Sequence, residues 1–222
     1  MKTLLMAFSL LLPWPLRRWW LGRFFGYEIH PTARIGRSWV QPGRLVMGPR
    51  SRIGSGTVCK GLALVELGEG AHLGNLNWVT GLPSGHPRYF RDQPERRPEL
   101  RLGRHAAVTN RHLIDCTGAV TIGAFSTFAG FQSQVLTHSI DLAASRQASA
   151  PVSIGEYCFV GTNCVLLGGS VLPDRSVLGA KSLLNKAHAE PGTLYGGVPA
   201  RALRPLPVGE MAYFQRQGGW VD

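Results

Sequence analysis

One histidine, His138, lies in the segment QVLTHSIDL (residues 134–142), between a run that reads as strand and a run that reads as loop. The pattern on both sides favours small and aliphatic residues, so an imidazole there calls for an explanation. A neutral imidazole accepts a proton with a pKa of ~6.5, which suits a general base near neutral pH. Asp141, three residues further on, could orient the ring and stabilise its charged form. Asp115 is predicted to occupy a turn, and most of the other histidines to lie on the surface or in loops.

The element that positions His138 is predicted from a six-residue repeat. Every sixth residue near the end of the chain is aliphatic: Ile154, Val160, Leu166, Leu172, Leu178 and Leu184. A small residue follows four places later each time: Cys158, Cys164, Ser170, Ser176 and Ser182. A helix with ~3.6 residues per turn would spread such positions around its circumference. The alternation of a strand does not by itself require small residues at a fixed phase. The repeat therefore indicates neither element alone.

A triangular prism does require both features, because aliphatic residues fill its interior and small ones fit where the backbone turns a corner. Three faces of six residues give about 18 residues per coil, and the hexads predict about seven coils in an all-β domain. We expect an aromatic and basic N-terminal segment over residues 1–28, the prism over 29–187 and a C-terminal cap and tail over 188–222. The repeat breaks at 81–99 and 139–151, which are predicted to be functional loops.

Composition narrows the classes of function. The 222 residues are 44% hydrophobic and 17% charged, with 28 glycines and 15 prolines, which favours an ordered domain with many tight turns. A formal charge of +11 favours phosphates, an anionic membrane face or a polyanionic substrate. Zinc-finger, RNA-binding and helix-turn-helix patterns are absent, so nucleic acid is not an expected partner. Four cysteines without a C-x-x-C pair indicate buried free thiols in a reducing compartment.

The N-terminal segment supports two interpretations. Its apolar run, residues 4–12, is much shorter than the ~20 residues of a spanning helix, and Pro13 and Pro15 end it. A small-x-small cleavage site does not follow the run. Arginines alternate with aromatic residues from Trp14 to Phe25, as in segments that lie in a lipid interface. Residues 1–25 are thus predicted either to contact a membrane peripherally or to cap one end of the prism.

The sequence resembles the hexapeptide-repeat acyltransferases, which fold as a left-handed parallel β-helix, and especially their branch of sugar and polysaccharide O-acetyltransferases. The most specific part of the resemblance is PVSIGEYCFVGTNCVLLGGSVLPDRSVLGAKSLLNKAHAEPGTLYGGVPAR, residues 151–201. It is similar to the closing coils of that family and to its terminal G-x-P-A-[KR] motif. The resemblance covers about residues 29–205.

The resemblance implies a homotrimer, with acetyl-CoA in the groove between adjacent prisms and a carbohydrate hydroxyl as acceptor. We expect the protein to be cytoplasmic, either free or peripheral on the inner face of the membrane. It assigns the role of general base to His138 and implies no metal. It also implies a set of coenzyme contacts: Gly161 and Ala180 along the pantetheine arm, Asn185 and Lys186 at the adenosine end, and Arg201 at a phosphate. The identity of the acceptor stays open.

Two alternatives share the predicted fold. A metalloenzyme of the γ-carbonic anhydrase kind needs three histidines that meet at a subunit interface. His105 and His112 are seven residues apart, and no third ligand is evident. A non-catalytic scaffold is the second alternative, but it leaves His138 and the C-terminal motif unexplained.

Overall fold

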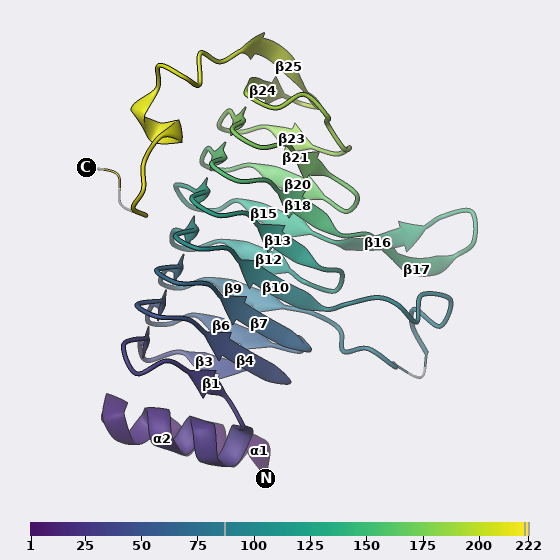
Figure 1. The fold of residues 1–222 in the computed structure, drawn as a ribbon. Coiled ribbons are helices and arrows are strands. Elements are labelled where there is room, and N and C mark those ends of the chain that lie inside the picture. Colours follow the sequence, from purple (N-terminus) through teal and green to yellow (C-terminus); the bar gives the residue numbers. More distant parts are fainter. Residues whose placement is uncertain (87, 220, 222) are drawn as a thin grey trace.

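The computed structural model describes residues 1–86, 88–219 and 221. The chain forms a left-handed parallel β-helix, a prism of stacked coils with two helices at its N-terminal end (Figure 1). Each coil contributes one short strand to each of three parallel sheets. The predicted all-β architecture is therefore confirmed.

The three sheets consist of strands that pair in register from coil to coil. The first sheet contains β1 (Glu28–Ile29), β4 (Arg44–Met47), β7 (Leu64–Leu67), β10 (Glu99–Leu102), β13 (Val120–Ile122), β18 (Val152–Ile154) and β21 (Val171–Leu172). The second contains β2 (Arg34–Ile35), β5 (Arg52–Ile53), β8 (His72–Leu73), β11 (Ala107–Val108), β14 (Thr127–Phe128), β19 (Phe159–Val160), β22 (Val177–Leu178), β24 (Thr193–Gly197) and β25 (Ala200–Pro205). The third contains β3 (Trp39–Gln41), β6 (Val58–Lys60), β9 (Trp78–Thr80), β12 (Leu113–Asp115), β15 (Gln134–Leu136), β20 (Val165–Leu167) and β23 (Leu183–Leu184).

The hexad residues occupy the positions that the repeat predicts. Val160, Leu166 and Leu172 point into the prism and are fully buried, and so are the small corner residues Cys158 and Ser170. The corners are crowded because the backbones of successive coils stack directly on one another. A Cβ on Gly123, for example, would lie 2.5 Å from the carbonyl carbon of Gly155. This crowding explains why the repeat selects small residues at a fixed phase.

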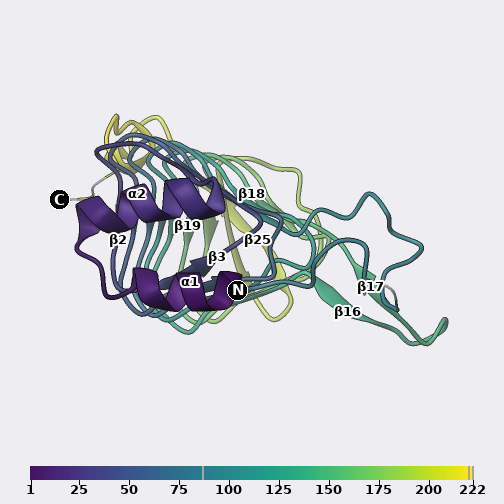
Figure 2. The same cartoon turned by 90° about the horizontal axis from the view of Figure 1, so that it is seen from below.

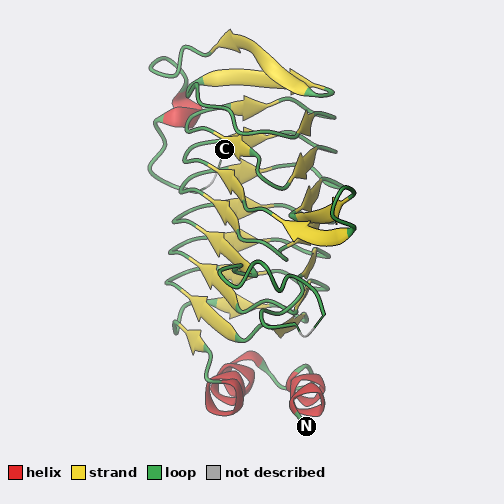
Figure 3. Cartoon of the chain, turned by 90° about the vertical axis from the view of Figure 1, so that its right-hand side faces the viewer, coloured by secondary structure: helices red, strands yellow, loops and turns green. Residues whose placement is uncertain are grey.

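Two excursions leave the prism at the same corner, between the third and first sheets, and project from the same side (Figures 1 and 3). The first covers residues 81–98 and connects β9 to β10. The second was predicted as a loop, but it folds as an antiparallel hairpin of β16 (His138–Asp141) and β17 (Arg146–Ser149). Coil pairing continues past both excursions, since β7 pairs with β10 and β13 pairs with β18.

The N-terminal segment caps the first coil. Helices α1 (Lys2–Ser9) and α2 (Trp14–Phe25) lie side by side across that end of the prism (Figure 2). Met6 and Leu21 are fully buried beneath them. Arg17 is also buried and donates hydrogen bonds to the carbonyl oxygens of Gly36 and Ser38, at 2.6 and 2.7 Å. The helices therefore cover a sheet edge that would otherwise be open. Within the described residues, no helix combines the length and hydropathy that a membrane span requires.

The C-terminal segment covers the opposite end. Strands β24 and β25 form a hairpin that extends the second sheet past β22. The chain then returns along the prism through a short 3-10 helix, Ala212–Phe214. The hydroxyl of Tyr213 donates to the carbonyl of Cys158 at 2.8 Å, and that of Tyr157 donates to the carbonyl of Arg216 at 3.1 Å. These contacts tie the tail to the side of the coil stack.

Candidate active site

His138 lies at the corner from which both excursions leave the prism. Asp115 ends β12, on the first of the two coils between the excursions, and His138 begins β16 directly after Thr137. Strands β12 and β15 pair so that Asp115 lies opposite Leu136. The coil geometry therefore brings a carboxylate and an imidazole together although they are 23 residues apart in the sequence.

The two side chains form a hydrogen-bonded pair. Nδ1 of His138 lies 2.8 Å from Oδ2 of Asp115. Because a carboxylate only accepts, the proton of the neutral ring is assigned to Nδ1, and Nε2 is left with its lone pair. The imidazole is 37% exposed, whereas the Asp115 side chain is 9% exposed. This arrangement presents a basic nitrogen to solvent while the carboxylate stays covered.

Two threonines hold the Asp115 carboxylate in place. Oδ1 accepts hydrogen bonds from the amide and hydroxyl of Thr117, at 3.1 and 2.6 Å. Oδ2 accepts from the amide and hydroxyl of Thr137, at 2.9 and 2.7 Å. Burial by itself would raise the pKa of Asp115, but the hydrogen bonds from Thr117, Thr137 and His138 outweigh it and hold this pKa below its ordinary value. Asp115 is therefore a fixed negative charge next to the imidazole.

The expected partner of the ring, Asp141, lies elsewhere. It stands opposite Arg146 in the hairpin, and its Oδ1 accepts a hydrogen bond from the amide of Ala144 at the turn. The prediction that Asp141 orients the imidazole is thus wrong for this geometry, because the strand carries its side chain away from His138 and toward the hairpin turn. The prediction that Asp115 occupies a turn is also wrong, because Asp115 ends β12.

A cavity of about 440 Å³ opens beside the imidazole, and we call it the imidazole cavity. Its lining consists of Leu136, Thr137, His138, Ser139, Ala148, Ser149, Ala150, Leu167, Gly168 and Asn185. Gly168 has little room for a side chain, since a Cβ there would lie 3.0 Å from the carbonyl oxygen of Thr137. Asn185, which the resemblance assigns to the adenosine end, shares this cavity with His138.

Three of the other four predicted coenzyme residues lie away from His138 within one chain. Gly161 and Ala180 stack at the corner between the second and third sheets, where the amide nitrogen of Ala180 lies 2.6 Å from the position of a Cβ on Gly161. Lys186 is exposed beyond β23, and Arg201 is exposed on β25, opposite Gly196. The fold thus places Gly161, Ala180 and Arg201 away from the imidazole, whereas Lys186 directly follows Asn185 at the corner that carries His138.

The cysteines do not provide an alternative nucleophile. All four are buried free thiols, as predicted. Cys116 follows Asp115 directly, but burial raises its pKa well above the ordinary value, so the thiolate is disfavoured. His105 and His112, the two histidines of the metalloenzyme alternative, lie at different corners of the prism. Among the described residues, no three His, Cys, Asp or Glu side chains are grouped to hold a metal.

Comparison with known proteins gives matches among solved structures alone. No family model matches the chain, and no curated protein matches it. A hexapeptide-repeat acetyltransferase from Vibrio cholerae in complex with acetyl coenzyme A is 22% identical and has a TM-score of 0.49, with 91% of this chain and 83% of that chain covered. A hexapeptide transferase family protein from Anaplasma phagocytophilum is 19% identical, with a TM-score of 0.49 and coverage of 85% and 84%. A variant of an N-acyltransferase from Bacillus cereus, in complex with dTDP-4-amino-4,6-dideoxyglucose and coenzyme A, is 14% identical, with a TM-score of 0.48 and coverage of 81% and 80%.

Sequence reasoning did not find Asp115, Thr117 or Thr137. The signal that could have found them is the alignment of one coil on the next. It places Leu113 opposite Gln134 and Asp115 opposite Leu136. A carboxylate at the end of a third-sheet strand therefore lies below the residues that follow the next third-sheet strand, which here are Thr137 and His138.

Proposed function

We propose that this protein is an acetyl-CoA-dependent O-acetyltransferase that acts on a carbohydrate hydroxyl, with His138 as its general base. The observation that carries the proposal is the His138–Asp115 pair, in which Nδ1 of the imidazole is held by the carboxylate and the histidine lines a cavity at a corner of the coil stack. The sequence resemblance to hexapeptide-repeat acyltransferases, centred on residues 151–201, supports the acyl donor.

The chemistry follows from the weak nucleophilicity of a hydroxyl group. Nε2 of His138 removes the hydroxyl proton as the acceptor oxygen attacks the thioester carbonyl. The resulting imidazolium is stabilised by the Asp115 carboxylate on the opposite side of the ring. When the carbon–sulfur bond breaks, the imidazolium returns the proton to the departing CoA thiolate. The products are an acetyl ester and CoA–SH, and His138 is neutral again.

We propose further that the active form is a homotrimer, because Gly161, Ala180 and Arg201, three of the residues assigned to acetyl-CoA, lie away from the corner that carries the base. Three prisms around a threefold axis would bring one corner of each next to another corner of its neighbour. The outward positions of the third sheet support such an interface. They form a mostly apolar ladder of Trp39, Val58, Trp78, Leu113, Gln134, Val165 and Leu183.

The proposal is tested by acetyl-CoA-dependent release of free thiol in the presence of a panel of saccharides. We expect thiol release that depends on the acceptor, with one O-acetyl group added to the product by mass spectrometry, from a particle whose mass by light scattering is that of three chains. Stoichiometric zinc or iron in the purified protein together with no transfer to any acceptor would favour the metalloenzyme alternative.

We also propose that the cap contacts the anionic inner face of the cytoplasmic membrane. Its outer surface is apolar and continuous, since the ring of Phe8 contacts that of Trp20, and the ring of Trp20 contacts that of Phe24, with centroids 4.9 and 4.2 Å apart. Leu11 and Trp19 are more than half exposed. Residues 1–27 contain no acidic side chain, and beside the buried Arg17 they include Lys2, Arg18 and Arg23, which are exposed or partly exposed. Exposed apolar and basic side chains together favour an anionic lipid surface.

The membrane proposal predicts that Leu11→Ser combined with Trp19→Ser weakens binding to phosphatidylglycerol-containing vesicles about tenfold or more, because both side chains leave the interface. The matched control is Leu142→Ser combined with Leu203→Ser, which removes exposed apolar side chains elsewhere on the molecule. Flotation with and without phosphatidylglycerol measures the effect. Equal loss in both variants, or binding that ignores the anionic lipid, contradicts the proposal. If this surface is instead covered by self-association, the particle mass measured by light scattering without lipid will differ between the wild-type protein and the Leu11→Ser, Trp19→Ser variant.

A further inference from the structure

The two excursions are joined to each other and enclose a space next to the imidazole. The side chain of Gln93 pairs with the backbone of Ser149. Its Nε2 donates to the carbonyl at 3.1 Å, and its Oε1 accepts from the amide at 3.0 Å. The carboxylate of Asp92 also forms an ion pair with Arg146 at 3.2 Å. The loop and the hairpin are thus held as two walls of one cleft.

The first excursion is itself anchored on the prism by Arg96. Its guanidinium is buried and donates to the carbonyl oxygens of Leu82, Pro83 and Thr117, at 2.8, 2.8 and 2.5 Å. It also lies 4.3 Å from the centroid of the Phe90 ring. Phe90 has a φ of +58°, an unusual conformation for an aromatic residue, and is itself buried. The loop therefore holds Phe90 in a defined position.

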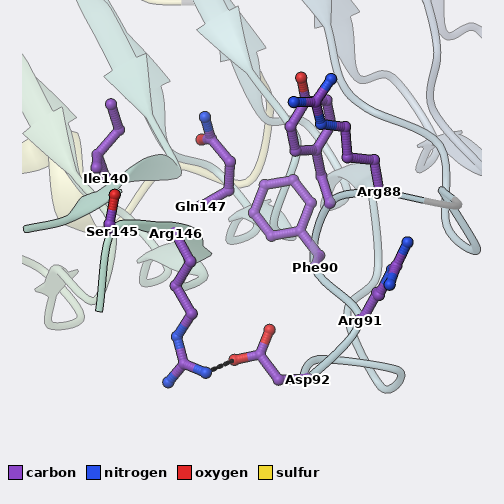
Figure 4. A pocket seen from close by; sticks show the side chains of 9 residues that line it. Arg88, Phe90, Arg91, Asp92, Ile140, Ser145, Arg146 and Gln147 are labelled. Atoms are coloured by element: carbon purple, nitrogen blue, oxygen red, sulfur yellow. Dashed lines mark ion pairs between the residues drawn. The ribbon is translucent and has the colours of Figure 1, made fainter.

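The cleft contains a cavity of about 510 Å³, within the ~300–1,000 Å³ range of small-molecule sites, and we call it the interloop cavity. Its lining consists of Arg88, Tyr89, Phe90, Arg91, Asp92, Ile140, Ser145, Arg146 and Gln147. Figure 4 shows the Phe90 ring between Gln147 of the hairpin and Arg88 of the loop, with the Arg146–Asp92 pair bridging the two walls. Three arginines and a single aspartate give the lining a net positive charge.

The interloop cavity adjoins the imidazole. The rings of Phe90 and His138 meet edge to face, with centroids 6.4 Å apart. His138 and Ile140 are two residues apart on β16, so their side chains project from the same face of the hairpin. His138 therefore stands between two spaces, with the imidazole cavity on one side and the Phe90 wall of the interloop cavity on the other.

We propose that the interloop cavity binds the acceptor and that this acceptor is an anionic saccharide, one that carries a phosphate or carboxylate group. This inference rests on the proposed function. Arg88 and Arg91 hold the anion, because guanidinium groups bind phosphates and carboxylates through paired hydrogen bonds. The sugar ring lies against the apolar wall around Phe90, and its hydroxyl reaches His138. The basic lining thus selects the acceptor by charge, while the imidazole cavity receives the thioester.

The test compares glucose with glucose 1-phosphate and with glucuronic acid, by calorimetry at low ionic strength on the full chain without acetyl-CoA. We expect at least one charged sugar to bind about tenfold more tightly than glucose, and the better of the two identifies the preferred anion. Arg88→Gln combined with Arg91→Gln is expected to remove that preference. Arg97→Gln is the matched control, since Arg97 is an exposed arginine of the same loop that does not line the cavity.

Equal affinity of the wild-type protein for all three sugars would overturn the proposal, and this comparison needs no variant. A loss of preference in Arg97→Gln as large as that in the double variant would also overturn it. Thiol release measured on the same proteins separates the two proposals. Acetyl transfer without a preference for charged sugars would contradict the anionic acceptor but not the transferase activity. Charge-selective binding without transfer to any saccharide would contradict the transferase activity but not the anion site.

Discussion

Replacement of His138 by alanine is expected to lower the turnover of acetyl transfer by about 10²- to 10⁴-fold and to leave the affinity for acetyl-CoA nearly unchanged. The reason is that the acceptor hydroxyl loses its proton acceptor, whereas no coenzyme contact depends on the imidazole alone. The ring is partly exposed and contributes no apolar core, so the fold is expected to persist. Steady-state thiol release gives the turnover, and calorimetry gives the binding of acetyl-CoA.

His30→Ala is the matched control for this experiment. His30 is exposed on the first coil, and its Nδ1 hydrogen-bonds locally, with the Thr32 hydroxyl at 2.9 Å. Its removal is expected to leave turnover near the wild-type level. If His138→Ala transferred acetyl groups at close to the wild-type rate, the assignment of the base would be wrong.

The second large effect is expected from Asp115→Asn, which should lower turnover about 10²-fold or more. The amide keeps the shape of the carboxylate but removes the negative charge that stabilises the imidazolium. In the wild-type protein the amide of Thr117 donates to Oδ1 at 3.1 Å. With the NH₂ group of asparagine at that position, two donors would face each other. That clash is expected to destabilise the fold by ~1–3 kcal/mol. Asp141→Asn is the matched control, because its carboxylate lies at the hairpin turn. Equal losses in both variants would contradict a special role for Asp115.

The pH dependence of the free energy of unfolding separates the contribution of the Asp115 charge from that of its shape. The pKa of Asp115 in the fold lies below its ordinary value of 3.8, so the carboxylate stabilises the fold above that value. This contribution is lost as the pH falls through the lower pKa of the folded protein. The wild-type protein is therefore expected to lose stability below about pH 4, and Asp115→Asn to lack that component. Chemical denaturation at successive pH values measures it, and parallel curves for the two proteins would argue against a charged Asp115.

The architecture was predictable because the repeat encodes it directly. Aliphatic and small residues recur at fixed phases, and the structure buries both sets at the predicted interior and corner positions. The hairpin formed by 138–149 was not predictable in the same way. Its Ser- and Ala-rich sequence lacks an alternating apolar pattern. It is held by cross-strand pairing and by the contact of Gln93 with Ser149, a residue 56 positions away.

The site was predictable only in part, for a related reason. His138 was conspicuous because it interrupts a regular pattern, but its partner was sought among its neighbours in the sequence. In a solenoid the relevant neighbour is one coil away, and an excursion can lengthen that separation. Here Asp115 lies 23 residues before His138, and Thr137 reaches the same carboxylate from the next coil. Phe90 is more distant still, and nothing in its local sequence marks it.

Both excursions begin after a third-sheet strand and end before a first-sheet strand, and the coils on either side pair as though nothing had been inserted. Segments at this corner can thus be lengthened, shortened or exchanged between related solenoids without a change in the pairing of the coils. Asp115, at the end of β12, belongs to that unchanged stack and holds the imidazole of His138 by a hydrogen bond. Natural or laboratory evolution can accordingly exchange either excursion while the Asp115 carboxylate stays where it is.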